Sequence, residues 1–248
     1  MAITIKTQDQ IQRMRVAGAI LADLDEILRD MVKPGVTTNE LDRVAEDFIR
    51  SRGAEPSFLG YGGYPKSICT SVNDEIVHGI PSNRKLKNGD IISIDMGSYI
   101  GGYHGDCART YGVGNISPED QKLIDVTKQS FFEGIKFAKA GCHLFDISAA
   151  VQDYVEPFGF GIVRDYVGHG IGRHMHEDPA IPNYRQRGRG PKLLKGMCLA
   201  IEPMVTAGTY EVKVLEDEWT AVTRDGKNAA HYENTVYITD GEPEILTL

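Results

Sequence analysis

Residues 85–96 read KLKNGDIISIDM, and residues 192–203 read KLLKGMCLAIEP. The two stretches align without a gap, so that Asp95 falls on Glu202. In both, side chains alternate between an apolar face and a face that carries the acid, which is typical of a β-strand. The apolar positions are Ile92, Ile94, Leu199 and Ile201. We therefore expect two equivalent strands, each of which ends in a carboxylate.

The segments that precede these strands also repeat. Residues 33–53 (KPGVTTNELDRVAEDFIRSRG) align with residues 139–159 (KAGCHLFDISAAVQDYVEPFG) at nearly the same offset. Two matches of this kind indicate an internal duplication. We expect a single domain over 1–248, made of pseudo-symmetric halves at about 1–112 and 113–248, each of which reads as helix, helix and then strands.

The helices of both halves have recognisable starts. Thr7 and Thr37, each with Gln or Glu three residues later, form capping-box patterns, and Ser117 precedes a proline at a first helical position. Helices are expected from Thr7 to before Pro34, from Thr37 to before Gly53, from Ser117 to Gly141, and from about Asp146 to Glu156.

Composition restricts the class of protein. The net charge is −8 and no long basic run is present, which argues against a DNA-binding surface. No segment approaches the ~20 apolar residues of a membrane helix, and the first residues lack the apolar core of a signal peptide. We expect a cytoplasmic protein with no membrane partner. The four cysteines form no CxxC motif and are expected to be reduced thiols.

Acidic residues on apolar strands need an explanation. A pseudo-twofold axis would bring Asp95 and Glu202 face to face, and burying them is costly unless they are paired, protonated or bound to metal. Asp106 follows a glycine-rich hairpin, and Glu233 lies in HYENTVYIT, which reads as one strand. Together with His169 these acids suit hard to borderline divalent ions rather than a thiolate zinc site. Four carboxylates carry about −4, which matches two divalent cations.

These features resemble the short, bacterial form of the type I methionine aminopeptidases, and the resemblance covers nearly the whole chain. It rests on SVNDEIVHGIP (71–81), DIISIDMGSYIGGYHGDCART (90–110), VGHGIGRHMHEDP (167–179), GMCLAIEPM (196–204) and YENT (232–235). The resemblance implies a single catalytic domain with the pita-bread fold, an α+β fold whose pseudo-twofold, antiparallel-rich sheet is flanked by two helix pairs. It implies removal of the N-terminal methionine from nascent proteins and peptides, with a small second residue favoured. It also implies two divalent ions (Co, Mn, Fe or Zn), held by Asp95, Asp106, His169, Glu202 and Glu233.

The resemblance further assigns roles near the metals. Glu202 would move the proton of the attacking water, His176 would donate a hydrogen bond to the scissile peptide oxygen, and His78 would act on the amide side. The residues that match the methionine pocket are Phe58, Tyr61, Tyr64, Cys69 and Trp219.

Other residues of these motifs are less informative. His174 is expected to be non-catalytic, and His104 and His231, each two residues before a ligand, either to orient the ligands or to be exposed. The chain departs from the common family pattern at Phe58, Met175 and Asn234.

Three alternatives remain open. Proline-specific peptidases look similar near the metals but usually carry a large N-terminal domain, whereas helical patterning here begins near Thr7. Non-enzymatic relatives tend to lose ligands. A two-metal phosphoester hydrolase would need a phosphate-binding cluster, for which RQRGRGPK (185–192), expected to be an exposed loop, is the only candidate. That loop would instead face ribosomal RNA or nascent chains in a transient contact. The expected partner is the N-terminus of a peptide or nascent chain, and the protein is expected to be a monomer.

Overall fold

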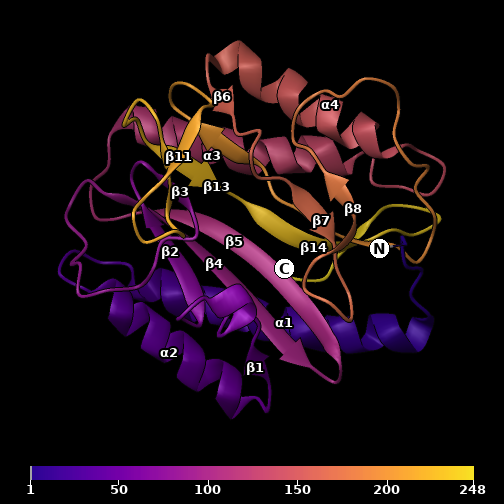
Figure 1. The fold of residues 1–248 in the computed structure, drawn as a ribbon, viewed down its shortest axis with the longest axis horizontal. Coiled ribbons are helices and arrows are strands. Elements are labelled where there is room, and N and C mark those ends of the chain that lie inside the picture. Colours follow the sequence, from indigo (N-terminus) through magenta and orange to yellow (C-terminus); the bar gives the residue numbers. More distant parts are fainter. Residues whose placement is uncertain (1) are drawn as a thin grey trace.

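The computed structural model describes residues 2–248. Two helix pairs lie at opposite ends of a central sheet (Figure 1). The longer helices are α1 (Gln8–Met31), α2 (Thr38–Ser51), α3 (Pro118–Ile135) and α4 (Leu144–Val155), with short 3₁₀ turns η1 (Tyr61–Gly63) and η2 (Glu156–Phe158). The predicted capping boxes at Thr7 and Thr37 are both formed, and Ser117 caps α3 through the backbone N–H of Asp120. Within the described range, none of the helices is long and apolar enough to cross a membrane.

Two helix boundaries differ from those expected. α3 ends at Ile135 instead of Gly141, because the N–H groups of Phe137 and Ala138 bond to carbonyls three residues back, which tightens and ends the helix. α4 begins at Leu144 rather than about Asp146. The Asp146 carboxylate lies inside the first turn and accepts from the backbone N–H of His143 at 2.9 Å.

The large sheet has nine strands, and all its pairings are antiparallel. Its main order is β1 (Glu55–Pro56), β4 (Ile91–Ile100), β5 (Tyr103–Gly112), β14 (Glu233–Tyr237), β9 (Cys198–Ile201), β7 (Gly168–Gly170) and β8 (Glu177–Ile181), while β2 (Ile68–Val72) pairs with β4 and β15 (Glu244–Ile245) with β14. The repeat-related strands β4 and β9 therefore flank the central pair β5–β14. The division of the chain into halves at about residue 112 stays a prediction.

Two smaller sheets continue from this one. They contain β13 (Ala229–His231), β10 (Met204–Thr206) and β6 (Gly161–Ile162), and β11 (Val212–Val214), β12 (Ala221–Thr223) and β3 (Glu75–Val77). The expectation of one strand through HYENTVYIT is wrong. The chain changes sheet at Tyr232, whose N–H bonds to the carbonyl of Pro203, so that His231 and Glu233 lie on either side of the junction.

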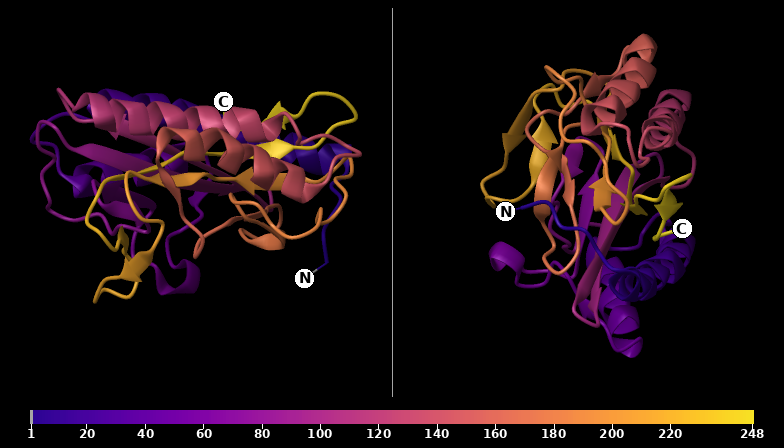
Figure 2. Two further views of the ribbon diagram at one scale, coloured as in Figure 1. Left: turned by 90° about the horizontal axis from the view of Figure 1, so that it is seen from above. Right: turned by 90° about the vertical axis from the view of Figure 1, so that its right-hand side faces the viewer.

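The apolar faces of the two repeat strands pack on different helix pairs. Ile92 and Ile94 join a core cluster with residues of α1 and α2, and Leu199 and Ile201 join one with residues of α3 and α4. In the left-hand view of Figure 2, α3 lies along the upper side of the sheet and the β11–β12 hairpin projects below it. The acid-bearing positions of these strands consequently point away from the helices.

Candidate metal centre

A cavity of about 160 Å³ lies on the acid-bearing face of the sheet. Every site residue expected from the sequence lines it, together with Met175. The lining comprises Phe58, Tyr61, Tyr64, Cys69, His78, Asp95, Asp106, His169, Met175, His176, Glu202, Trp219 and Glu233. Residues separated by more than 170 positions in the chain therefore meet in one place.

The register of three strands sets the positions of the acids. Asp95 on β4 and Glu233 on β14 both pair with Ala108 of β5, one from each side. These three residues form a row across the sheet, with a small side chain between the two carboxylates. Asp106 lies two residues from Ala108 on the same strand, and therefore on the same face.

The two repeat-related acids are not fully equivalent. Asp95 lies in the middle of β4, which continues to Ile100, so the expectation that it ends a strand is wrong. Glu202 does follow the last residue of β9 and precedes Pro203, as expected. The long β4–β5 hairpin explains the difference, because it carries β4 five residues beyond the acid.

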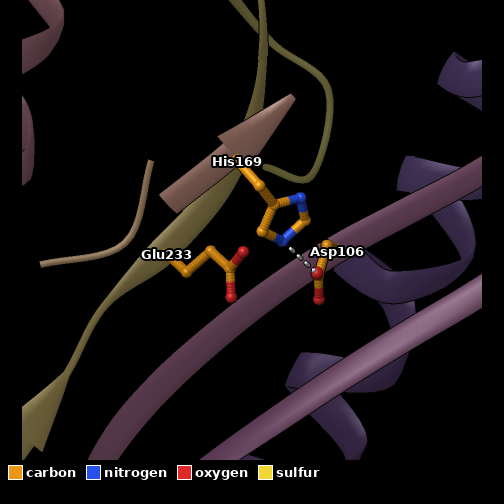
Figure 3. A group of neighbouring side chains, drawn as sticks. All are labelled: Asp106, His169 and Glu233. Atoms are coloured by element: carbon orange, nitrogen blue, oxygen red, sulfur yellow. Dashed lines mark ion pairs between the residues drawn. The ribbon is translucent and has the colours of Figure 1, made fainter. Parts of the chain in front are cut away.

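His169 reaches the acids from β7, where its neighbours have to be glycines. A Cβ at Gly168 would lie 2.4 Å from the carbonyl oxygen of Ala200, and one at Gly170 would lie 2.2 Å from that of Asp178. The His169 Nδ1–H donates to the Gly170 carbonyl at 2.9 Å, which leaves Nε2 unprotonated. Nε2 lies 3.5 Å from Asp106 Oδ2 (Figure 3) and 3.6 Å from Glu202 Oε1.

Burial and mutual repulsion destabilise the charged forms of the acids. Burial is the largest cause in each case: it raises the pKa of Asp95 to about 7 and the pKa values of Asp106, Glu202 and Glu233 well above their usual range. Neighbouring carboxylates add to the shifts of Asp95, Asp106 and Glu233. Burial also lowers the pKa of His169 to about 3, so that its imidazole is neutral at physiological pH.

The donor set fits divalent cations. Asp95 Oδ1, Asp106 Oδ1 and Glu233 Oε1 are buried and have no hydrogen-bond partner within residues 2–248. Buried carboxylates without partners call for protons or cations. Ligand atoms lie within 4.8 Å of one another in two groups that share Glu233, one with Asp106 and His169 and one with Glu202 and His231. Figure 3 shows the first group converging from three strands.

His176 and His78 stand beside the acids. The His176 ring lies 4.2 Å from that of His169, centroid to centroid, and its Nδ1 lies 2.8 Å from the hydroxyl oxygen of Tyr61. His78 has a φ of 61°, a strained value for a residue with a side chain. The following Gly79 is required, because a Cβ there would lie 2.2 Å from the carbonyl oxygen of Thr70. Burial lowers the pKa of both histidines, that of His78 to about 4.

An apolar pocket adjoins the acids. Phe58, Tyr64, Cys69 and Met175 form a buried cluster against which Ile80 and Trp219 pack. Trp219 reaches it from the tip of the β11–β12 hairpin, where the Asp217 carboxylate accepts from the N–H groups of Trp219 and Thr220. The Tyr64 and Trp219 rings meet edge to face, with centroids 5.1 Å apart.

The remaining histidines differ in setting. His174 is exposed and does not line the cavity, and its non-catalytic role stays a prediction, while half-buried His104 contacts Ser57 Oγ through Nδ1 at 2.9 Å. His231 is only 1 % exposed, so the option that it lies at the surface is wrong. His231 lies two residues before Glu233, and this spacing was the one feature of the sequence that indicated its place near the acids. Asn234 points away from the acids, because its Oδ1 accepts from Arg109 and Thr247.

A buried cluster of carboxylates and imidazoles at the centre of a sheet flanked by two helix pairs is typical of a metallohydrolase. The chain matches the model of metallopeptidase family M24 over residues 12–240. It is 60 % identical to a methionine aminopeptidase of Clostridium acetobutylicum over 99 % of both chains. A solved methionine aminopeptidase of Rickettsia prowazekii superposes with a TM-score of 0.97 at 43 % identity, with both chains fully covered. The chain therefore belongs to metallopeptidase family M24 and, within it, to the methionine aminopeptidases, and the predicted pita-bread fold is confirmed.

The proline-specific alternative is more distant. The Xaa-Pro dipeptidase of Bacillus anthracis shares the fold with a TM-score of 0.78, but at 25 % identity, and this chain spans 61 % of that protein. The catalytic fold is common to both enzymes, whereas the high identity over the full length lies with the methionine aminopeptidases.

Proposed function

We propose that this protein removes the N-terminal methionine from nascent proteins and peptides and favours substrates with a small second residue. The proposal rests on one observation. The cavity that the five expected ligands line is also lined by the side chains of the apolar pocket beside them. A peptide whose first side chain enters the pocket would therefore place its first peptide bond beside the acids.

We assign the metal ligands to Asp95, Asp106, His169, Glu202 and Glu233. Their charge balances two divalent cations, and their oxygen and nitrogen donors suit Mn, Fe, Co or Zn. When bound, such a pair supplies a water nucleophile that is active at neutral pH and polarises the scissile carbonyl group. The uncompensated acids support this assignment, because each gains a partner when cations are present.

The groups beside the acids would handle protons and charge. Glu202 accepts a proton from the attacking water and passes it to the leaving amine. His176 donates a hydrogen bond to the carbonyl oxygen as that oxygen gains negative charge, and Tyr61 holds the His176 ring at Nδ1. His78, kept neutral by burial, contacts the nitrogen side of the scissile amide.

The pocket explains the preference for methionine. Its side chains are aromatic or sulfur-containing, and a flexible thioether packs well against such surfaces. A small second residue is favoured because the site has to admit the chain beyond the scissile bond.

A turnover assay with measured metal content tests the function. Purified protein loaded with Mn²⁺ should release methionine from Met-Ala-Ser, and leave Xaa-Pro peptides and p-nitrophenyl phosphate intact. Cleavage of a proline peptide at a comparable rate, or of the phosphate ester alone, would contradict the assignment. Elemental analysis of the same sample should give two divalent ions per chain.

We further propose that the protein acts in the cytoplasm as a monomer and contacts the ribosome transiently through the loop 185–192. Arg187 and Arg189 in this loop are exposed, and Arg189 lies 3.4 Å from the Asp146 carboxylate. Co-sedimentation with ribosomes should weaken as salt is raised, and more so for the double variant Arg187→Ala/Arg189→Ala. Binding that ignores both salt and the substitutions would exclude this contact.

A further inference from the structure

His231 is held rigidly at the junction between two sheets. Its backbone N–H donates to Thr110 Oγ1 at 2.8 Å, and the same hydroxyl donates to the His231 carbonyl at 2.9 Å. Thr110 Oγ1 also lies 2.8 Å from Ser93 Oγ. All three residues are buried, so that the backbone from which the imidazole projects is held in one position.

The His231 ring faces the candidate ligands. Its Nε2 lies 3.6 Å from Glu202 Oε2 and 3.8 Å from Glu233 Oε2. Over residues 2–248 neither ring nitrogen has a hydrogen-bond partner, although the residue is 1 % exposed. Burying an imidazole without a hydrogen bond to either nitrogen costs free energy, which indicates that His231 has a function in the site.

Glu202 lies between two imidazoles. Its Oε1 faces His169 Nε2 at 3.6 Å, and its Oε2 faces His231 Nε2 at the same distance. The terminal torsion of a glutamate is soft and its two oxygens are chemically equivalent, so the carboxylate alone does not select one orientation. A hydrogen-bond donor on one oxygen removes that equivalence.

We propose that His231 is a positioning residue, which donates a hydrogen bond from Nε2 to Glu202 Oε2 and thereby directs Oε1 toward the cation beside His169. This inference rests on the role proposed above for Glu202. The 3.6 Å gap closes by a small rotation of the Glu202 carboxylate, and Glu202 is then held at one oxygen while the other remains free to bind.

The proposal fixes the tautomer of the His231 ring. A neutral imidazole has one N–H, so that Nδ1 has to accept a hydrogen bond if Nε2 donates. His231 also lines a second cavity of about 450 Å³, whose polar lining includes Asp25, Arg109 and Lys128. The structure gives Nδ1 no partner within residues 2–248, so the hydrogen bond from Nε2 is the one by which the ring can act on the acids.

Two substitutions separate hydrogen bonding from other roles. In His231→Leu no donor remains, whereas in His231→Gln the amide N–H donates to the same carboxylate. His143→Leu is the matched control, because His143 lies at the start of α4 and lines neither cavity. Each full-length variant is measured for Mn²⁺ affinity by titration calorimetry, for the visible spectrum with Co²⁺, and for kcat and KM on Met-Ala-Ser.

We expect His231→Leu to lose roughly 10- to 100-fold in Mn²⁺ affinity or in kcat at saturating metal, as for other residues that orient metal ligands, with KM little changed. His231→Gln should recover most of this loss and keep the parent Co²⁺ spectrum. If His231→Leu does not fold, His231→Met, which also lacks a donor, takes its place.

The inference is overturned if His231→Leu matches the parent in both affinity and kcat. It is also overturned if His231→Gln is as impaired as His231→Leu and its Co²⁺ spectrum changes, because the imidazole would then bind the metal directly. Failure of the parent and of His143→Leu to cleave Met-Ala-Ser would instead refute the proposed function, so the two failures can be told apart.

Discussion

The β4–β5 hairpin and the β9–β14 pair occupy corresponding places in the sheet, yet they contribute different chemistry. The hairpin carries two aspartates, and its own His104 does not line the cavity. The other pair carries two glutamates, whose longer side chains meet His169 and His231. His169 also reaches Asp106 of the hairpin, whereas, of the four acids, the His231 ring lies within 4 Å of the two glutamates only. The comparison teaches that corresponding strand positions set where the acids lie, while the imidazoles reach them from neighbouring strands.

The pocket draws most of its side chains from the early part of the chain. Those that precede β4 are Phe58, Tyr61, Tyr64, Cys69 and His78, whereas Met175 and Trp219 come from the later part. We therefore interpret the early part of the chain as selecting the substrate and the later part as moving protons. The following predictions test this division.

The largest difference is expected between Glu202→Gln and Asp95→Asn. At saturating Mn²⁺, Glu202→Gln should lower kcat roughly 10³-fold, because general acid–base catalysis contributes about 10²- to 10⁴-fold. Asp95→Asn should mainly weaken Mn²⁺ binding and recover activity as metal is added. Calorimetry gives the Mn²⁺ affinity of both variants, and steady-state kinetics give their kcat. Equal losses in both quantities would mean that the two acids have the same role.

His176→Ala should lower kcat by about 10²-fold with little change in KM, since a lost donor to the oxyanion typically costs 10²- to 10³-fold. His174→Ala is the control in the same loop, because that side chain does not line the cavity. Equal kcat values for the two variants would remove His176 from the reaction.

Trp219→Ala should reduce kcat/KM for Met-Ala-Ser by roughly 3- to 10-fold, mainly through KM. An aromatic contact such as that with Tyr64 contributes about 0.5–1.5 kcal/mol, and 1.4 kcal/mol corresponds to a factor of ten. Leu215→Ala alters an exposed side chain of the same hairpin and should leave kcat/KM unchanged. A loss confined to kcat would contradict a pocket role for Trp219.

The smallest effect is expected in the pH dependence of stability. The pKa of Asp95 is about 7 in the folded chain against an ordinary value of 3.8, so between these values the folded state binds a proton that the unfolded state has lost. Raising the pH through this window therefore destabilises the metal-free fold. Because cations replace these protons, the gap in Tm between Mn²⁺-loaded and chelated protein should widen by a few degrees from pH 4 to pH 7. A constant gap would contradict the coupling.

The acid-bearing face could be predicted from sequence because side chains alternate strictly along a strand. Once Ile92 and Ile94 were assigned to the core, Asp95 had to point to the opposite face, and the same holds for Glu202. The starts of α1 and α2 were equally accessible, since a capping box is a local interaction.

Other features depend on distant partners and were missed. HYENTVYIT contains β-branched and aromatic residues on both sides of Glu233, so nothing local marks the change of sheet at Tyr232. The burial of His231 results from Thr110 and Glu202, which are remote in sequence, whereas an isolated histidine is most often read as a surface residue. The end of α3, by contrast, is set locally, by a tightened last turn rather than by the glycine six residues later.

The position of β14 has a consequence for synthesis. This strand lies between β5 and β9 in the large sheet, yet of all the strands only β15 comes after it in the chain. While a ribosome elongates the chain, the earlier strands therefore lack the element that joins them. Pairings over such long separations form slowly. The enzyme should consequently gain activity only after the segment that carries β14 has been made and has joined β5 to β9.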